Sequence, residues 1–195
     1  SDSNPGTEAS PWLTIQKAAS TMVAGDAVHV KAGTYVANTN CDWNDAAIQP
    51  TNAGVSGSPI IFAAAPNHVV TLTNNGLAGC PVIGTKKSFV TIHGFTISNV
   101  GDKAIVAFSS GVRIQNVVIQ GNTVSGIQGP TCDNAEALSI RGVSNPIIRN
   151  NKIFDADSSP SGCDGAGIRF YNVDNAVVEN NEIYDVTYGI YDKDN

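Results

Sequence analysis

Acids, arginines and tyrosines gather in two similar stretches of the sequence, and these side chains could bind a charged sugar. The stretches are "SGIQGPTCDNAEALSIR" (125–141) and "DADSSPSGCDGAGIRFY" (155–171). Carboxylates bind Ca²⁺ and guanidinium groups clamp carboxylates, while tyrosine rings offer apolar faces to pyranoses. The acids are Asp133, Glu136, Asp155, Asp157 and Asp164. The other candidates are Ser139, Arg141, Arg169, Tyr171 and Tyr191. A carbohydrate-binding groove is therefore expected if the fold brings both stretches together.

An internal repeat provides that fold. The phrase "PIIRNNKIFDA" (146–156) recurs as "AVVENNEIYDV" (176–186), with the charged residues exchanged in sign. One isoleucine of each such phrase serves as an anchor, in the order Ile97, Ile119, Ile153 and Ile183. One apolar strand in each repeat of ~20–30 residues is typical of a parallel β-solenoid, in which each coil buries its apolar face against its neighbours.

A second short strand precedes each phrase and extends this prediction. Its first inward column is expected to contain Val82, Ala104, Leu138 and Ile168. A second inward column, two residues later, is expected to contain Gly84, Val106, Ile140 and Phe170. The residues between them should point outward, as Ile83, Ile105, Ser139 and Arg169. Alternation of this kind places Ser139 and Arg169 on the solvent side of the sheet.

Stacked coils would also explain the exchanged charges. Arg149 and Glu179 should be neighbours on adjacent coils, and Lys152 and Glu182 should form a second pair. Opposite charges at such positions contribute ~0.2–1 kcal/mol. A column of Asn116, Asn150 and Asn180 could hydrogen-bond from coil to coil. His93 should belong to the outward column of Gln115, Arg149 and Glu179, as a structural residue.

The two site stretches lengthen their coils and should bulge as loops just before the second strand. Both loops contain a Cys-Asp pair, so a Cys132–Cys163 disulfide could join neighbouring coils, while Cys41 pairs with Cys80. This is one of three possible connectivities. The outward residues Ser139, Arg141, Arg169, Tyr171 and Tyr191 would then line a flank beside these loops.

Composition narrows the class of protein. The formal net charge of −6 disfavours a nucleic-acid partner, which needs clustered lysines and arginines. Four cysteines without a CxxC pair favour disulfides and an oxidising compartment. The chain lacks an apolar run long enough to span a membrane. Its polar start, "SDSNPGTEAS", is typical of a secreted protein after processing.

The first residues differ from the repeats. Ser10 is a candidate N-cap with Pro11 at the first helical position, and Gly25 should end the helix. The apolar stripe of this helix consists of Ile15, Ala18, Ala19 and Met22. The segment "DAVHVKAGTY" then predicts the first strand, with a turn at Gly33. A helix here would cover the apolar end of the first coil.

The stretch "DSNPGTEASPWLTIQKAASTMVAGDAVHVKAGTY" resembles the N-terminus of secreted proteins of the pectate-lyase-like superfamily. The resemblance implies an all-β right-handed parallel β-helix with an N-terminal capping helix. One domain over residues 1–195 follows, with the cap in 1–25 and stacked coils in 26–195. The motif indicates the fold and says little about function, because the superfamily includes lyases, hydrolases, epimerases and non-catalytic modules.

Lyases of this superfamily cleave uronic-acid polymers by β-elimination, so the resemblance implies specific roles. Arg169 or Arg141 would remove the C5 proton, and Lys193 is a weaker candidate. A Ca²⁺ ion would be held by Asp133, Glu136 and Asp164. Tyr171, Tyr191 and Ser139 would contact the polysaccharide.

Structural explanations compete with these roles. The two arginines could simply pair with acids of the loops, and the last coil looks incomplete after Ile183. Aligning Ile190 with Ile168 puts Asp192 in an inward column, so either the register slips there or the coil is incomplete and continues in a longer chain or is covered by another chain. A non-catalytic surface or filament-forming protein, which would self-associate, is therefore the alternative to a carbohydrate-active module.

Overall fold

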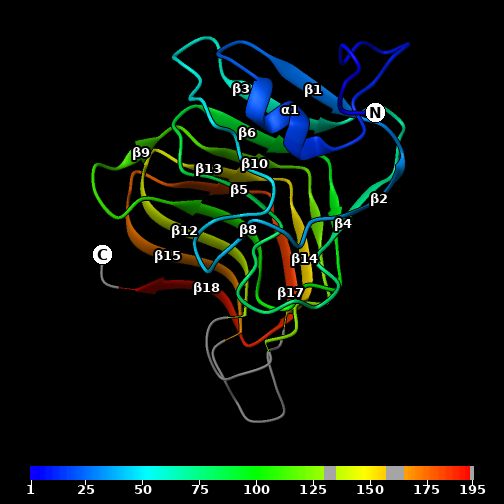
Figure 1. Ribbon diagram of the computed structural model, residues 1–195. Helices are drawn as coiled ribbons and strands as arrows, with labels where there is room; N and C mark the ends of the chain where they lie inside the picture. Colours follow the sequence, from blue (N-terminus) through cyan, green and yellow to red (C-terminus); the bar gives the residue numbers. More distant parts are fainter. Residues whose placement is uncertain (130–134, 157–164, 194–195) are drawn as a thin grey trace.

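The structure is a computed structural model that describes residues 1–129, 135–156 and 165–193. The chain forms a parallel β-helix built from three sheets, with a short helix at its N-terminal end (Figure 1). Each coil contributes its strands to the sheets in turn, so strands of neighbouring coils pair in parallel. The predicted β-solenoid is confirmed.

In each of the three sheets the strands follow chain order along the β-helix. The first sheet contains β1 (Ala27–Val30), β3 (Ile60–Ala64), β6 (Val90–His93), β10 (Val118–Gln120), β13 (Ile147–Arg149) and β16 (Val177–Glu179). The second contains β2 (Gly33–Val36), β4 (Val70–Thr73), β7 (Thr96–Ile97), β11 (Thr123–Val124), β14 (Lys152–Ala156) and β17 (Glu182–Val186). The third contains β5 (Ile83–Thr85), β8 (Lys103–Phe108), β12 (Glu136–Ser144), β15 (Ala166–Asp174) and β18 (Tyr188–Lys193), while β9 (Ile114–Gln115) pairs with β12.

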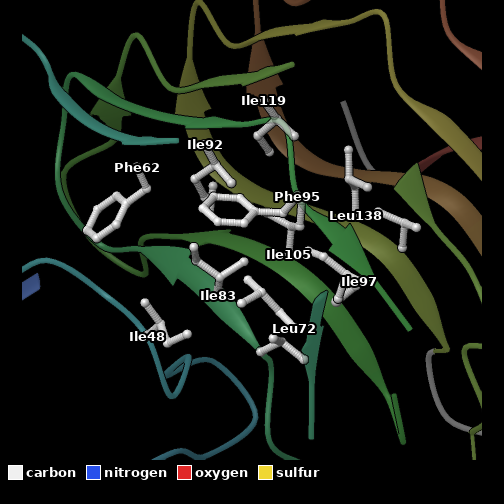
Figure 2. Close-up of a cluster of buried hydrophobic side chains, with 14 of the residues drawn as sticks. Ile48, Phe62, Leu72, Ile83, Ile92, Phe95, Ile97, Ile105, Ile119 and Leu138 are labelled. Atoms are coloured by element: carbon white, nitrogen blue, oxygen red, sulfur yellow. The ribbon is translucent and has the colours of Figure 1, made fainter. Parts of the chain in front are cut away.

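Apolar side chains fill the interior in vertical files, one file or more for each sheet (Figure 2). Ile97 pairs with Val124, and Ile153 pairs with both Val124 and Ile183. The predicted anchor Ile119 was wrong, because it belongs to the first sheet, between Ile92 and Ile148. The phrase around Ile119 holds two apolar strands close together, so spacing alone selected the wrong one. Each fully buried isoleucine contributes ~1.5–3 kcal/mol.

The register of the third sheet also differs from the prediction in its first coils. Ile83 and Ile105, rather than Val82 and Ala104, align with Leu138 and Ile168. The next column therefore contains Gly84, Val106, Ser139 and Arg169. The segment "AIVA" (104–107) is apolar at every position, so it carries no alternation that could fix the register. From β12 onward, where polar residues alternate, the predicted pairing of Ser139 with Arg169 is confirmed.

Asparagines form the corners between the first and second sheets, in a way that corrects the predicted column. The Nδ2 of Asn122 donates to Oδ1 of Asn151 at 3.1 Å, and Asn151 donates likewise to Asn181 at 2.9 Å. The predicted residues Asn150 and Asn180 lie one position earlier, with φ of 55° and 54°. Asparagine tolerates this left-handed backbone better than most residues. Thus one asparagine of each pair turns the chain and the next links the coils.

Asn116 lies at a different corner from this ladder. Its backbone N–H donates to the carbonyl of Ser144 on the next coil, beside Asn145, which also has a positive φ. The Nδ2 of Asn175 in turn donates a hydrogen bond to Oδ1 of Asn145 at 3.2 Å. Asn116 was therefore assigned to the wrong column, because two corners of a coil carry asparagine.

The charged residues that are exchanged in sign between the two repeated phrases lie side by side on neighbouring coils, as predicted. Arg149 lies 3.8 Å from Glu179, and Lys152 lies 3.5 Å from Glu182. His93 belongs to the Arg149 column, but Gln120 rather than Gln115 lies between them. Its Nδ1 lies 3.1 Å from the Gln120 carbonyl, in line with the structural role expected for this histidine.

The helix α1 (Ile15–Thr21) begins later than predicted. Its N-cap is Thr14, which accepts from the Lys17 backbone N–H at 3.2 Å, whereas Ser10 closes a preceding turn with Thr7. The predicted stripe of Ile15, Ala18, Ala19 and Met22 is buried, so the helix does cover the first coil. In the described part of the chain, no helix is long and apolar enough to span a bilayer.

In the described residues, the last coil pairs with a neighbouring coil on one side only. Ile190 pairs with Ile168, and Asp192 pairs with Phe170, as the sequence predicts. Asp192 is exposed rather than buried, and Ile190 is 52% exposed. The described end of the β-helix therefore presents apolar side chains to solvent.

Candidate functional site

The outer face of the third sheet, the side that points away from the core, carries most of the predicted site residues. Two sets of side chains lie along this sheet. The exposed ladder consists of Lys86, Phe108, Arg141, Tyr171 and Lys193. The buried row consists of Asp102, Lys103, Glu136 and Arg169. The coils stack these residues because the strands of this sheet pair in parallel register.

Arg141 is the central residue of the exposed ladder. Its guanidinium lies 5.7 Å from the Phe108 ring centre and 5.0 Å from that of Tyr171, one ring on each neighbouring coil. Such contacts hold a guanidinium through cation–π attraction, ~0.5–1 kcal/mol each at exposed sites. The arginine also lines a hollow of about 260 Å³ with Ser109, Ser110 and Asn172, among others. The hollow therefore combines a guanidinium with hydroxyl and amide groups, which could hydrogen-bond a hydroxylated ligand.

Arg141 differs from the other arginines in its charge partner. Arg113 is paired with Asp174 at 2.7 Å, Arg149 with Glu179, and Arg169 with Glu136. Within residues 1–129, 135–156 and 165–193, no carboxylate forms an ion pair with Arg141. Arg141 is thus a half-buried cation whose contacts in the described residues are with aromatic rings rather than with a carboxylate.

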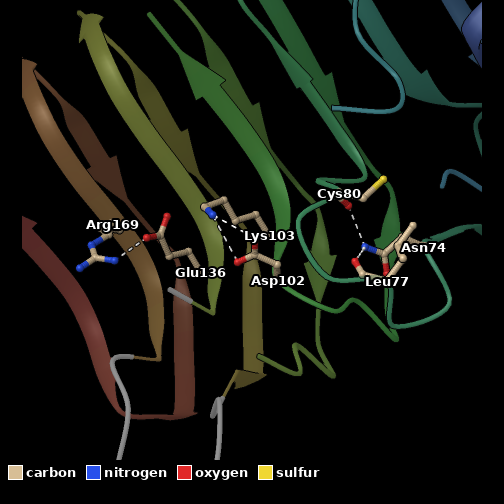
Figure 3. Close-up of polar contacts among 7 residues, drawn as sticks. All are labelled: Asn74, Leu77, Cys80, Asp102, Lys103, Glu136 and Arg169. Atoms are coloured by element: carbon tan, nitrogen blue, oxygen red, sulfur yellow. Dashed lines mark hydrogen bonds and ion pairs between the residues drawn. The ribbon is translucent and has the colours of Figure 1, made fainter. Parts of the chain in front are cut away.

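Arg169 occupies a different environment, because it belongs to the buried row. Its Nη1 lies 2.5 Å from Oε1 of Glu136, and the two residues are 6% and 2% exposed (Figure 3). The guanidinium also lies 5.0 Å from the ring centre of Tyr191, which stacks on Tyr188. Arg169 is outward, as predicted, but it is covered and paired. The structural explanation of this arginine, pairing with an acid, therefore agrees with the geometry.

The other pair of the buried row is Asp102 and Lys103, which sequence reasoning did not single out. The Lys103 ammonium lies 3.2 and 3.1 Å from the two Asp102 carboxylate oxygens, and 5.3 Å from the Trp43 ring centre. Burial raises the pKa of Asp102 to about 6, although Lys103 opposes this shift. An Asp-Lys dipeptide immediately before an apolar strand was the available signal, since ionic side chains there must be buried as a pair.

Ser139 lies between the two sets and is fully buried. Its Oγ has no hydrogen-bond partner, and Oε2 of Glu136 also lacks one within the described chain. Ser139 pairs with Arg169 across the strands, so one of these two oxygens belongs to the buried row and the other lies on a neighbour of Arg169. Its contact with a polysaccharide stays a prediction, and its burial places it below the surface that a polymer would touch.

Several predicted residues cannot be placed. Asp133, Asp157, Asp164, Cys132 and Cys163 lie outside the described residues, so their metal and disulfide roles stay predictions. Asp155 lies on β14 with φ of 52°, at a corner of its coil. The predicted Cys41–Cys80 disulfide is confirmed, with the two Cα atoms 5.0 Å apart.

The predicted calcium site is only partly represented by the described chain. Of its three ligands, Glu136 alone is described, and Arg169 already binds its Oε1. Nowhere in residues 1–129, 135–156 and 165–193 do three His, Cys, Asp or Glu side chains come together in a way that suits a metal ion. The calcium site therefore stays a prediction.

Comparisons with known proteins agree with the fold. A solved structure titled "Rhamnogalacturonan lyase" aligns with a TM-score of 0.69 at 19% identity, over 98% of this chain and 59% of that one. A second, described as a mannuronic acid specific polysaccharide family 6 lyase enzyme from human gut microbiota, aligns with a TM-score of 0.51 at 17% identity. This second alignment covers 90% of our chain and 48% of the chain in the solved structure. The chain therefore spans about half the length of these structures.

At these identities the likeness concerns the fold alone. No curated protein sequence matches the chain. Residues 1–185 match the family described as "Pel9A-like, right handed beta helix region", which also gives the handedness of the β-helix. This match covers nearly the whole sequence, and we conclude that the chain belongs to the Pel9A-like right-handed β-helix family.

Proposed function

We propose that the protein binds an acidic polysaccharide on the outer face of the third sheet, with Arg141 holding a uronate carboxylate. The observation that carries this proposal is the state of Arg141, which lies between two aromatic rings without a carboxylate partner in the described chain. A guanidinium held in one plane is pre-organised for bidentate contact with a carboxylate. The hydroxyl and amide groups of the adjoining hollow suit the hydroxyls of a sugar.

The charge of the protein makes this site selective. The chain carries a net charge of −6, so its surface repels a polyanion except where a local cation attracts it. Lys86 and Lys193 lie at the two ends of the exposed ladder, although Lys86 also pairs with Asp45 at 2.6 Å. The ladder thus provides a cationic strip that crosses several coils.

Cleavage by β-elimination is the second part of the proposal. A uronate carboxylate bound by Arg141 would lose negative charge, and this makes the C5 proton more acidic. Arg141, as the charged clamp, cannot also accept the C5 proton, and Arg169 is covered and paired with Glu136. Of the predicted bases this leaves Lys193, which pairs with Tyr171 on the exposed ladder; in its neutral form it would take the C5 proton while the C4–O4 bond breaks and O4 leaves with a proton from water. The lyase titles of the two aligned structures support testing this reaction. The disulfide between Cys41 and Cys80 supports an exported, extracellular protein.

One experiment separates binding from cleavage. The protein is titrated calorimetrically with oligosaccharides of pectate, alginate and chondroitin, and with neutral dextran as the control. The same mixtures are monitored for the ultraviolet absorbance of unsaturated uronates. Binding to one acidic polymer but not to dextran is expected, and absorbance growth would add the lyase activity. Equal affinity for dextran, or no binding to any polymer, would contradict the proposal.

A further inference from the structure

The exposed ladder carries a second cation close to Arg141. Lys86 follows β5 directly, and its Nζ lies 5.4 Å from the ring centre of Phe108. The guanidinium of Arg141 lies 5.7 Å from the centre of the same ring. Phe108 belongs to β8, which lies between β5 and β12 in the third sheet. The two cations therefore belong to coils on the two sides of the Phe108 coil.

This spacing suits the charges of an acidic polysaccharide. Neighbouring strands are ~4.8 Å apart, so cations that are two coils apart are separated by about 10 Å along the axis of the β-helix. An extended polysaccharide advances by a distance similar to one coil with each sugar. A polymer that crosses the strands would thus bring the carboxylates of one sugar and of the next but one near Arg141 and Lys86.

Lys86 already has a carboxylate partner, which is Asp45. The Nζ of Lys86 lies 2.6 Å from Oδ1 of Asp45, and both side chains are 36% exposed. The hydrogen bond from Lys86 holds the pKa of Asp45 below its ordinary value of 3.8, so this acid is charged at neutral pH. The Nε2 of Gln49 donates to the same oxygen at 3.1 Å and helps to hold the carboxylate in place.

An exposed ion pair of this kind leaves room for a ligand. Such pairs contribute about 0–1 kcal/mol, because water screens both charges. An ammonium has three N–H donors, and the contact with Oδ1 of Asp45 uses one of them. A second carboxylate can therefore approach Lys86, but it also meets the negative charge of Asp45, which opposes it.

Building on the proposed function of Arg141, we propose that Lys86 is a second carboxylate-binding position of the ladder and that Asp45 weakens it by competing with the ligand. Lys86 takes the carboxylate of the sugar two residues from the one at Arg141. The substrate class that fits is an extended acidic polysaccharide that presents a carboxylate to the same side at every second sugar. Arg141 supplies the main attraction, because no carboxylate of the described chain forms an ion pair with it.

The experiment measures how affinity grows with the length of the ligand. Oligosaccharides of pectate, alginate and chondroitin are titrated calorimetrically in pairs, in which only the longer member contains two carboxylates that are two sugars apart. The wild-type protein should bind the longer member of a pair about two- to fivefold more tightly, as expected for one exposed ion pair. Lys86→Met should abolish this gain, and Asp45→Asn should increase it, because the competing charge is removed.

Lys152 and Glu182 provide the matched control on the second sheet. Lys152 also lies over aromatic rings, at 5.7 and 5.4 Å from their centres, and it pairs with Glu182 at 3.5 Å. Lys152→Met and Glu182→Gln change the net charge of the protein as Lys86→Met and Asp45→Asn do. They should leave the gain unchanged, and circular dichroism shows whether each variant is folded.

Failure of the second position can be distinguished from failure of the site itself. Wild-type affinity in Arg141→Ala for every ligand, or no binding by the wild-type protein, would overturn both. Weaker binding by Arg141→Ala together with an unchanged gain in Lys86→Met would overturn the position at Lys86 alone. An unchanged gain in folded Asp45→Asn would overturn the competing role of Asp45.

Discussion

Arg141 and Arg169 lie on the same face of one sheet, in adjacent strands, and each contacts a tyrosine ring, yet they differ in burial and in charge partner. Arg169 is 6% exposed and bound to Glu136, whereas Arg141 lies between Phe108 and Tyr171 and has no carboxylate partner in the described chain. The buried row near the strand starts thus uses its charges within the protein. The exposed ladder, a few residues further along the strands, holds a cation that we propose binds a ligand.

The largest expected effect is a loss of stability when Arg169 of the buried row is replaced. Arg169→Ala removes the partner of Glu136 and leaves a buried charge, so the free energy of unfolding should fall by about 3–5 kcal/mol. Urea denaturation measures this change. The matched variant Arg141→Ala should change stability by less than about 1 kcal/mol, because its side chain is half-exposed and holds no carboxylate of the described chain. Equal losses for both variants would remove the distinction between the two regions.

A smaller effect concerns the exposed side. Arg141→Lys keeps the charge but loses the planar fork and its stacking on Phe108 and Tyr171. Affinity for the bound acidic oligosaccharide should fall by about tenfold, as one charge-assisted hydrogen bond is lost. Calorimetric titration measures the affinity, with unfolding curves as the control. Wild-type affinity in this variant would mean that only the charge of Arg141 matters.

The pH dependence of stability isolates Asp102. Burial raises its pKa from 3.8 to about 6 in the folded protein, so folding favours the protonated carboxyl. The associated stability is present at low pH and is lost as the pH rises through about 6. Lowering the pH from about 7 to about 5 should therefore add about 1 kcal/mol to the free energy of unfolding relative to Asp102→Asn. Identical pH profiles for the two proteins would show that Asp102 titrates normally.

The smallest effect lies in the repeated phrase, away from both regions. Glu179→Arg places a like charge beside Arg149 and should cost about 0.2–1 kcal/mol. The double exchange Arg149→Glu/Glu179→Arg should restore most of this loss, because the opposite pair is re-formed. Urea midpoints of the wild-type protein, both single variants and the double variant give the coupling. A double exchange as unstable as the single variant would mean that the ion pair contributes nothing.

Much of the fold followed from the sequence because stacked coils repeat their chemistry. The exchanged charges at Arg149 and Glu179 predicted vertical neighbours, and those neighbours are present. The predicted register was wrong where alternation was lacking, as at Ile105 in the uniformly apolar segment 104–107. It was also wrong where one phrase held two apolar strands, as at Ile119.

The site was harder to predict than the fold. The sequence placed Arg141 and Arg169 on the same outward face but could not distinguish a covered residue from an accessible one, because burial depends on what lies over the sheet. Asp102 and Lys103 were missed because their pairing depends on both being buried beside Trp43. Sequence patterns thus indicate which side chains share a face, while their accessibility requires the three-dimensional structure.

The most direct test of the proposed role of Arg141 uses one oligosaccharide in two forms, the uronate and its carboxyl-reduced neutral counterpart. Both are titrated into the wild-type protein and into Arg141→Ala. The wild-type protein should prefer the uronate by at least about tenfold, the equivalent of ~1.4 kcal/mol, and Arg141→Ala should bind both forms equally. An undiminished preference in Arg141→Ala would contradict the account, because the carboxylate would then be recognised elsewhere.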